Sequence, residues 1–435
     1  MSALLEFKGV GLTRGHRRIL DDLSLRLGSV DVMLIRGGNG SGKSSLIGAA
    51  VGTLGIHSGT IEVSGHLLQD GDGRRHLPTQ PIGLVLQGET MLPVERPLER
   101  LKDAGRRSGV DLESDGLERM LRTWGLGHRA EDPIAHLSGG QRRSVDVLAG
   151  LIPGLCSTEP RLLVLDEPDR GLDSDSIGRL VDLVRVLAGR GHGILVASHR
   201  HEWMSIATSV LDLEVNEWMH RDPLDRHDAQ PLVMGAGASV TMAAVRWTAR
   251  MEIRTGAWMT HGMFPALLFL LGALPFLTDA DADLIHAIRL TPALIIGLTG
   301  PPLLHALRTS EAASWWRATG GFTGLSVIPF MTVTVLTILA TVTTTGATGA
   351  PPLVAALCFV LAAHLMIAGL ERELSRLRSP GTSILMLKAV LMVPWLTLAS
   401  EPSMTVRGWM AIGITAILAL ATLLLTTRTV ARTPS

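Results

Sequence analysis

The octapeptide GGNGSGKS occupies residues 37–44 and decides how this sequence folds. It fits the pattern G-x-x-x-x-G-K-[ST], between an apolar run at 32–35 that predicts a strand and a helical stretch at 44–51. The glycines let backbone N–H groups close around phosphates, and the helix amino terminus adds its positive dipole end. Lys43 is then placed to reach the β- and γ-phosphates, and the Ser44 hydroxyl to hold Mg²⁺. The octapeptide therefore predicts a site for a nucleoside triphosphate.

Strands and helices alternate on both sides of this loop. Apolar runs predict further strands at 82–86, 162–165 and 194–197, and a helix at 177–187. Alternation of this kind favours a mainly parallel sheet whose ligand lies at the carboxyl ends of the strands. We therefore predict an α/β nucleotide-binding domain over residues 1–220.

A pair of acidic residues follows one of these strands. Residues 162–168 read LLVLDEP, so an apolar strand delivers Asp166 to its carboxyl end. A carboxylate there suits the orientation of Mg²⁺ through water, and Glu167 beside it is placed to polarise an attacking water.

A third motif, LSGGQ, occupies residues 137–141 and is followed by Arg142 and Arg143. Ser138 can cap a helix, while Gly139 and Gly140 leave backbone N–H groups that can face an anion. Without its neighbours this motif would be an ordinary capped turn. Its place about 25 residues before the acidic pair makes it informative.

The order P-loop, LSGGQ, LDEP resembles the ATP-binding cassette (ABC) ATPase family, over about the first 215 residues. The resemblance implies that Gln87 in LVLQGET is the Q-loop glutamine, which touches Mg²⁺ and faces the membrane domain. It likewise implies that Asp173 in GLDSDS acts across a dimer and that His199 in VASHR contacts the γ-phosphate. The implied catalytic residues are Glu167, His199 and Gln87, with Mg²⁺ held by Ser44, Gln87 and Asp166. The implied ATP-binding set is Gly37, Gly38, Asn39, Gly40, Ser41, Gly42, Lys43, Ser44, Ser45, Arg14, Ser138, Gly139, Gly140, Gln141 and Asp173.

One position departs from the family pattern. The family stacks adenine on an aromatic residue before the first long strand, and this sequence has LTRG at 12–15 instead. A guanidinium plane can stack on a base, so Arg14 or His16 is expected there.

The motif count implies a dimer. The family holds ATP between the P-loop of one cassette and the LSGGQ of another, and this chain has one of each. We predict a homodimer with two complete sites; a paralogous half-transporter is the alternative partner.

The composition changes in the second half of the chain. Charged residues are 18% of the whole but nearly vanish from long stretches after residue 261, and the mean hydropathy of +0.31 is high. We predict a linker at 221–240, an interfacial amphipathic helix at 241–260, and an all-α transmembrane domain over 261–435. A span needs about 20 residues, and six are predicted, at roughly 262–278, 285–305, 321–345, 353–370, 382–399 and 408–427.

Arginine placement orients these spans. The connections 306–320 and 371–380 and the carboxyl-terminal tail are arginine-rich, whereas the opposite connections hold few basic residues. Both termini are therefore predicted to be cytoplasmic, in a multi-pass protein of the cell (plasma or inner) membrane. The amino terminus has no signal-peptide pattern.

The connection between the second and third predicted spans reads TSEAASWWRATG, at 309–320. A short helix there could dock near Gln87 and transmit the nucleotide state, so Glu311, Trp315, Trp316 and Arg317 are predicted coupling residues. An ordinary belt of Trp and Arg at the lipid headgroups is the alternative.

Together these features predict an ATP-hydrolysing exporter of a hydrophobic or amphipathic small molecule or lipid, because cassette and permease are fused without a capture domain. An importer is one alternative. Another is a complex that uses ATP on a partner, as in cytochrome maturation or haem handling. The 40 acidic and 40 basic residues balance, so nucleic-acid binding is not expected. The two cysteines, Cys156 and Cys358, suggest neither a disulfide framework nor a metal site.

Overall fold

The computed structural model describes residues 3–14, 17–215, 217–220, 232–256, 264–273 and 311–319, with single positions at 224, 288, 291, 410, 413 and 417. Within these ranges, none of the helices is both long enough and apolar enough to cross a lipid bilayer. Helix α7 (Phe264–Ala273) falls in the first predicted span. The other five predicted spans lie outside the described residues, except for single positions, and they stay predictions.

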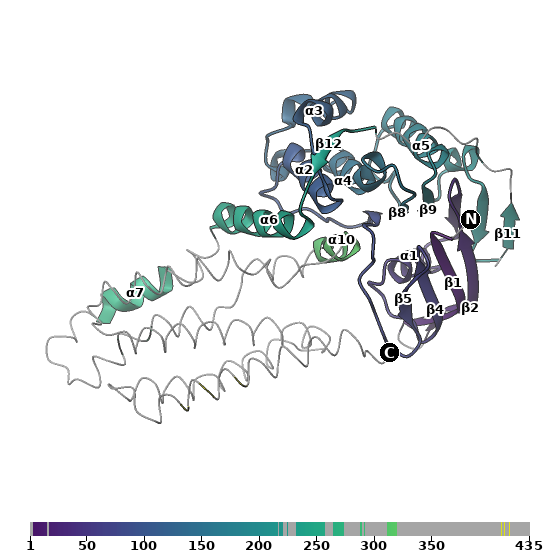
Figure 1. The fold of residues 1–435 in the computed structure, drawn as a ribbon, viewed down its shortest axis with the longest axis horizontal. Coiled ribbons are helices and arrows are strands. Elements are labelled where there is room, and N and C mark those ends of the chain that lie inside the picture. The colour runs from purple at the N-terminus through teal and green to yellow at the C-terminus, as the bar shows by residue number, and fades with distance from the viewer. Residues whose placement is uncertain are drawn as a thin grey trace. The chain divides into compact units, whose positions relative to one another are not determined.

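A six-stranded sheet forms the centre of the first half of the chain, in the order β11-β10-β3-β9-β8-β6. Figure 1 labels β8, β9 and β11 of this sheet. Neighbouring strands are parallel except β10 with β11. The predicted parallel sheet is therefore confirmed, and the carboxyl ends of β3, β8 and β9 meet at one edge. The strands are β3 (Val32–Arg36), β6 (Gly83–Val85), β8 (Leu162–Asp166), β9 (Gly193–Ala197), β10 (Ser209–Asp212) and β11 (Glu217–His220).

A second sheet, which the sequence pattern did not predict, is antiparallel and has the order β2-β1-β4-β5. Its strands mix buried with exposed positions, so they carry many polar residues and lack the unbroken apolar runs of the central sheet. The strands are β1 (Leu5–Arg14), β2 (Arg17–Leu27), β4 (Ser58–Val63) and β5 (His66–Asp70).

Helices cover the sheets. The predicted helices at 44–51 and 177–187 are present as α1 (Lys43–Ala50) and α5 (Ser174–Gly189). A helical layer follows β6 in sequence and contains α2 (Pro97–Arg107), α3 (Ser114–Thr123) and α4 (Gly139–Leu155). Short elements complete it: β7 (Val110–Leu112) paired with β12 (Gly235–Gly237), and 3₁₀ turns at Gly127–Arg129 and Ile134–His136. A further 3₁₀ turn, His201–Ser205, follows β9 and contacts α5.

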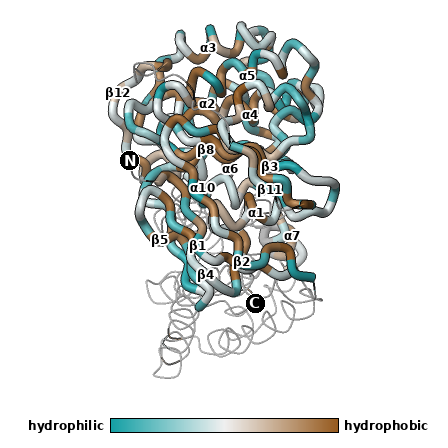
Figure 2. Tube along the Cα trace, turned by 90° about the vertical axis from the view of Figure 1, so that its right-hand side faces the viewer, coloured by the Kyte–Doolittle hydropathy of each residue, from teal (hydrophilic) through white to brown (hydrophobic). Residues whose placement is uncertain are grey.

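Helix α4 is the most deeply buried of these helices, and every residue from Arg143 to Leu155 is buried. It packs on β6 at Gly150, where an added Cβ would lie 2.4 Å from Val85 Cγ2 and 2.6 Å from the Leu84 carbonyl oxygen. Strand β8, which pairs with β6, and strand β3 of the same sheet are coloured hydrophobic along much of their length (Figure 2). Close packing of α4 thus fixes the strand that leads into the Q-loop.

Two segments that follow the first 220 residues belong to the same compact unit as these sheets. The unit contains Met1–Trp247 and also the described residues 311–319. Helix α6 (Val240–Thr255) begins in this unit and buries Trp247 on one face, with Arg246 exposed on the other. Helix α10 (Ala312–Ala318) lies along β6, the edge strand of the sheet.

The close approach at Gly150 predicts that alanine is less stable than glycine at this position, the reverse of the usual preference in a helix. In a helix, Gly→Ala normally stabilises by about 0.5–1 kcal/mol. We expect Gly150→Ala instead to lower the free energy of unfolding by about 1–3 kcal/mol through overpacking. Gly178→Ala in α5 is the matched control, because nothing lies within 4 Å of its added Cβ. Thermal unfolding in detergent checks the pair, and equal stabilisation by both changes contradicts this packing.

Candidate active site

The loop that joins β3 to α1 is shaped for phosphates. Gly37, Gly40 and Gly42 have φ angles of 137°, 80° and 108°, which side chains other than glycine rarely adopt. Lys43 is 6% exposed, and its Nζ donates hydrogen bonds to the carbonyls of Gly37 (2.7 Å) and Gly38 (2.9 Å). The ammonium group is thereby held over the loop, where phosphate oxygens can replace the carbonyls as its partners.

The carboxyl end of β8 brings an acid to the Ser44 hydroxyl. Asp166 is 3% exposed, and burial raises the pKa of its carboxyl to about 6, a shift that a hydrogen bond with Ser44 opposes. Its Oδ1 has no hydrogen-bond partner within the described part of the chain. A buried carboxylate oxygen and a hydroxyl at one point match the oxygen ligands that Mg²⁺ prefers, so these residues fit Mg²⁺.

Three of the predicted catalytic residues meet beside this point. Gln87 Nε2 donates to Glu167 Oε2 at 2.9 Å, and His199 Nε2 lies 3.7 Å from Glu167 Oε1. They follow β6, β8 and β9, so the parallel order of the sheet brings them together. A carboxylate flanked by an amide and an imidazole can orient a water molecule and accept its proton.

Asp169, which sequence reasoning missed, fixes the segment that carries His199. Asp169 is 2% exposed and accepts hydrogen bonds from Ser198 Oγ (2.7 Å) and Trp203 Nε1 (3.3 Å). Arg200 Nε lies 3.6 Å from the same carboxylate. Both neighbours of His199 are therefore held by one buried acid. An aspartate directly after LDEP was the available signal.

The LSGGQ segment begins helix α4 as predicted. Ser138 is the N-cap: its Oγ accepts from Gln141 N (3.2 Å), and Gln141 Oε1 accepts from Ser138 N (2.9 Å). An added Cβ on Gly140 would lie 3.0 Å from the Gly171 carbonyl oxygen, so this turn lies against the segment after LDEP. Asp173 in that segment caps α5 by accepting from Ser176 N at 2.8 Å.

Arg14 and Arg17 face each other where β1 and β2 pair. Arg14, the predicted adenine-stacking residue, is exposed, and His16 lies outside the described residues. Arg17 is nearer the loop, because an added Cβ on Gly40 would lie 3.9 Å from its Nη1. The sequence pattern gave no reason to prefer Arg17.

The predicted coupling residues lie on and beside α10, against the cassette. Glu311 Oε2 accepts a hydrogen bond from the backbone N–H of Gly88 at 3.0 Å, directly after Gln87. Arg317 Nη2 donates to the His76 carbonyl at 3.3 Å. The segment at 311–319 therefore contacts the Q-loop at one end and the antiparallel-sheet region at the other.

Two arginines of α2 stack on the tryptophans of α10. Arg100 Cζ lies 3.6 Å from the ring centroid of Trp315, and Arg107 Cζ lies 4.9 Å from that of Trp316. Trp247 of α6 completes the cluster, 4.6 Å from Trp316 between ring centroids. All five side chains are at most 1% exposed. Desolvation makes such cation–π pairs stronger than exposed ones.

A parallel sheet with a phosphate-binding loop after β3, and with Asp166 and Glu167 after β8, defines a P-loop nucleoside triphosphatase. The family model described as "ABC transporter" matches residues 20–170. Among curated proteins, the cytochrome c biogenesis ATP-binding export protein CcmA of Sphingopyxis alaskensis is 32% identical over 199 residues, which are 46% of this chain and 91% of that protein.

Two further relatives match a similar share of this chain. The protein of the same name from Bordetella bronchiseptica is 35% identical, over 51% of this chain and 93% of its own length. The hemin import ATP-binding protein HmuV of Pseudomonas entomophila is 33% identical, over 45% and 77%. The chain therefore belongs to the ABC transporter family, and it is an ATPase that uses ATP with Mg²⁺.

The position of Arg17 predicts which arginine contributes most to nucleotide binding. We expect Arg17→Ala to weaken ATP binding about tenfold, the equivalent of about 1.4 kcal/mol, because a guanidinium beside the phosphate-binding loop is lost. We expect a smaller effect from Arg14→Ala, the control at the paired position. Equilibrium binding of a fluorescent ATP analogue measures both. A larger effect at Arg14 would indicate that the base stacks there instead.

Proposed function

We propose that this chain is half of a homodimeric ATP-driven exporter, whose cassette drives a membrane domain in its own second half. The observation that carries the proposal is the contact between Glu311 and Gly88. Through it, a helix from beyond residue 300 meets the residue next to Gln87, whose amide binds the Glu167 carboxylate. A distant segment of the same chain therefore contacts Gly88, the residue directly after Gln87, which is one of the proposed catalytic residues.

In the proposed reaction, Glu167 accepts the proton of the water that attacks the γ-phosphate. Gln87 and His199 keep that water and the phosphate aligned, and Lys43 stabilises the charge on the phosphate oxygens. Mg²⁺, when bound to Ser44 and Asp166, supplies further stabilisation of that charge.

The proposed dimer follows from the position of LSGGQ. Gly139 and Gly140 at the start of α4 offer backbone N–H groups to an anion, and the chain has one such motif and one P-loop. In a homodimer each LSGGQ would complete the nucleotide site of the other copy. A paralogous half-transporter in place of the second copy is the alternative partner.

The proposed membrane domain is the six-span region at 261–435, in the cell membrane with both termini cytoplasmic. Its support is the long apolar stretches and the arginine-rich connections on one side. Alkaline extraction of membranes from expressing cells tests it. Recovery of the full-length protein in the soluble fraction contradicts a membrane domain.

The proposed substrate is hydrophobic or amphipathic. A second substrate class, haem, is favoured by one observation: two similar relatives are named for cytochrome c biogenesis export, and a third for hemin import. Stimulation of ATPase activity in lipid by haem, by lipids or by hydrophobic drugs distinguishes these classes. Turnover that no compound stimulates would favour use of ATP on a partner protein.

The proposed base predicts the behaviour of Glu167→Gln. We expect ATP turnover to fall about 10²–10⁴-fold, because the amide cannot accept a proton, with ATP binding retained. Steady-state hydrolysis by the purified protein in lipid measures the first quantity, and nucleotide binding the second. Glu159→Gln, an exposed acid before β8, is the control. Turnover within a few-fold of wild type in Glu167→Gln would contradict this assignment.

The proposed coupling predicts the behaviour of Glu311→Ala. A typical hydrogen bond contributes about 0.5–1.5 kcal/mol, so loss of this exposed one weakens docking at Gly88 by up to about tenfold. We expect the stimulation of ATPase activity by substrate to fall towards the basal level. Glu118→Ala on the exposed surface of α3 is the control. Undiminished stimulation in Glu311→Ala would exclude coupling through this contact.

A further inference from the structure

Arg143 of α4 is a buried cation that none of the recognised motifs explains. Its side chain is 9% exposed and forms three hydrogen bonds to backbone carbonyls. Nη1 donates to Leu86 O at 2.5 Å, and Nη2 donates to Asp166 O at 3.1 Å and Glu167 O at 2.6 Å. One guanidinium thus binds the ends of β6 and β8 together, at the residue before Gln87 and at Glu167 itself.

The Glu167 backbone needs such support. Its φ of 44° lies in the left-handed region, which costs a residue other than glycine about 1–3 kcal/mol unless the surroundings hold it. The N–H of Glu167 donates to Ala197 O at 2.8 Å, and its carbonyl accepts from Arg143. Hydrogen bonds on both sides of the residue therefore set the direction of its carboxylate.

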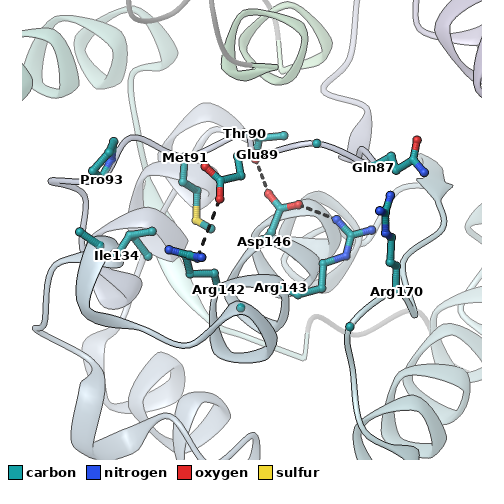
Figure 3. Close-up of a pocket in the computed structure, with 14 residues that line it drawn as sticks. Gln87, Glu89, Thr90, Met91, Pro93, Ile134, Arg142, Arg143, Asp146 and Arg170 are labelled. Atoms are coloured by element: carbon teal, nitrogen blue, oxygen red, sulfur yellow. Dashed lines mark hydrogen bonds and ion pairs between the residues drawn. The ribbon is translucent and has the colours of Figure 1, made fainter.

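Arg143 is itself fixed by a buried chain of polar groups. Asp146 lies 3.2 Å from Arg143 Nη1, and Thr90 Oγ1 donates to the same carboxylate (Figure 3). Arg100 Nη2 donates to Thr90 Oγ1 at 3.1 Å, and Arg100 stacks on Trp315 of α10. The chain is thus continuous from α10 to the Glu167 carbonyl.

A cavity of about 400 Å³ opens between the segment 87–93 and α4, and Thr90, Arg143 and Asp146 line it (Figure 3). Across this space the segment is connected to α4 by hydrogen bonds rather than by close packing alone. Hydrogen bonds of this kind can keep the segment in one position relative to α4, and they can break and let it move, whereas a fully packed core would prevent such movement.

We infer that Arg143 is a positioning residue for hydrolysis. We further infer that the hydrogen-bonded chain Arg100–Thr90–Asp146 makes the position of Arg143 depend on whether α10 is docked. The inference rests on the proposed role of Glu167 as the base. When α10 is seated on Arg100, the chain holds Arg143 against the Glu167 carbonyl and the end of β6. Displacement of α10 loosens Arg143, and Glu167 and Gln87 lose their alignment.

Arg143→Lys in the full-length protein in lipid tests the first step. Lysine keeps a cation beside Asp146 but cannot bind three carbonyls as a planar fork does. We expect kcat to fall about 100-fold, as a misplacement of about 1 Å produces, with the KM for ATP changed less than about twofold. The melting temperature is expected to fall below that of Arg122→Lys, an exposed control on α3, because lysine leaves buried carbonyls without a partner. The value of kcat is therefore compared at a temperature at which both variants are folded.

A double-mutant cycle separates positioning from general damage. If Arg143 acts through Glu167, then Arg143→Lys lowers the residual turnover of Glu167→Gln no further, as residues that act as one unit behave. If the double variant instead loses turnover by the product of the two single-variant factors, the inference is overturned. An unchanged kcat in Arg143→Lys alone also overturns it. Normal turnover in Glu167→Gln would instead contradict the proposed role of Glu167 as the general base, and the inference about Arg143 would fail with it.

Thr90→Val and Thr90→Ser test the chain at the residue whose hydroxyl connects Arg100 to Asp146. Valine keeps the volume without the hydroxyl, whereas serine keeps the hydroxyl. We expect Thr90→Val to lower kcat about tenfold and Thr90→Ser to restore it to within about twofold of wild type. Trp315→Ala is expected to add no further loss in the Thr90→Val background. Equal activities of the two Thr90 variants overturn the connection to α10.

Discussion

The active site depends on the parallel pairing of three strands. Because β3, β9 and β8 are adjacent and parallel, the loops after them meet at one edge of the sheet. The phosphate-binding loop, His199 and Glu167 each follow one of these strands. Their side chains converge even though more than 120 residues separate Lys43 from Glu167. Every strand residue of β8 and β9 is buried, so this arrangement lies in the core of the domain.

The interior of the helical layer contains buried charged side chains, whereas the interior of the central sheet is mostly apolar. Arg100 lies beside Glu95 at 3.4 Å, both at most 2% exposed, and burial raises the pKa of Glu95 while Arg100 lowers it. Such pairs contribute little net stability, but breaking one leaves an uncompensated buried charge. They do favour a single geometry. Here that geometry stacks Arg100 on Trp315, so the layer accepts α10 in a defined position beside the Q-loop.

Local patterns in the sequence were sufficient to predict most of the central sheet. They also placed the residues predicted to be catalytic after its strands, and the catalytic roles of these residues stay predictions. The apolar runs that became β3, β8 and β9 are short and unbroken, and the glycine loop at 37–44 has a fixed spacing. The antiparallel sheet was not predicted, because its half-exposed strands lack such runs and β1 pairs with β4 across the whole of α1. The roles of Asp169 and Arg143 were also missed, since their partners are distant in sequence.

The sequence by itself determined the class of site: a glycine-rich loop, a strand ending in two acids and LSGGQ each have a meaning that a few adjacent residues carry. Only the tertiary structure decided which groups hold them in place. Arg143 reaches carbonyls 57 and 24 residues away, and Glu311 reaches Gly88 across 223. No periodicity or spacing encodes these contacts, because a hydrogen bond between distant residues depends on how whole elements pack. Burial strengthens the bonds of Arg143 to Leu86 and Asp166 further, because it removes water as the competing partner.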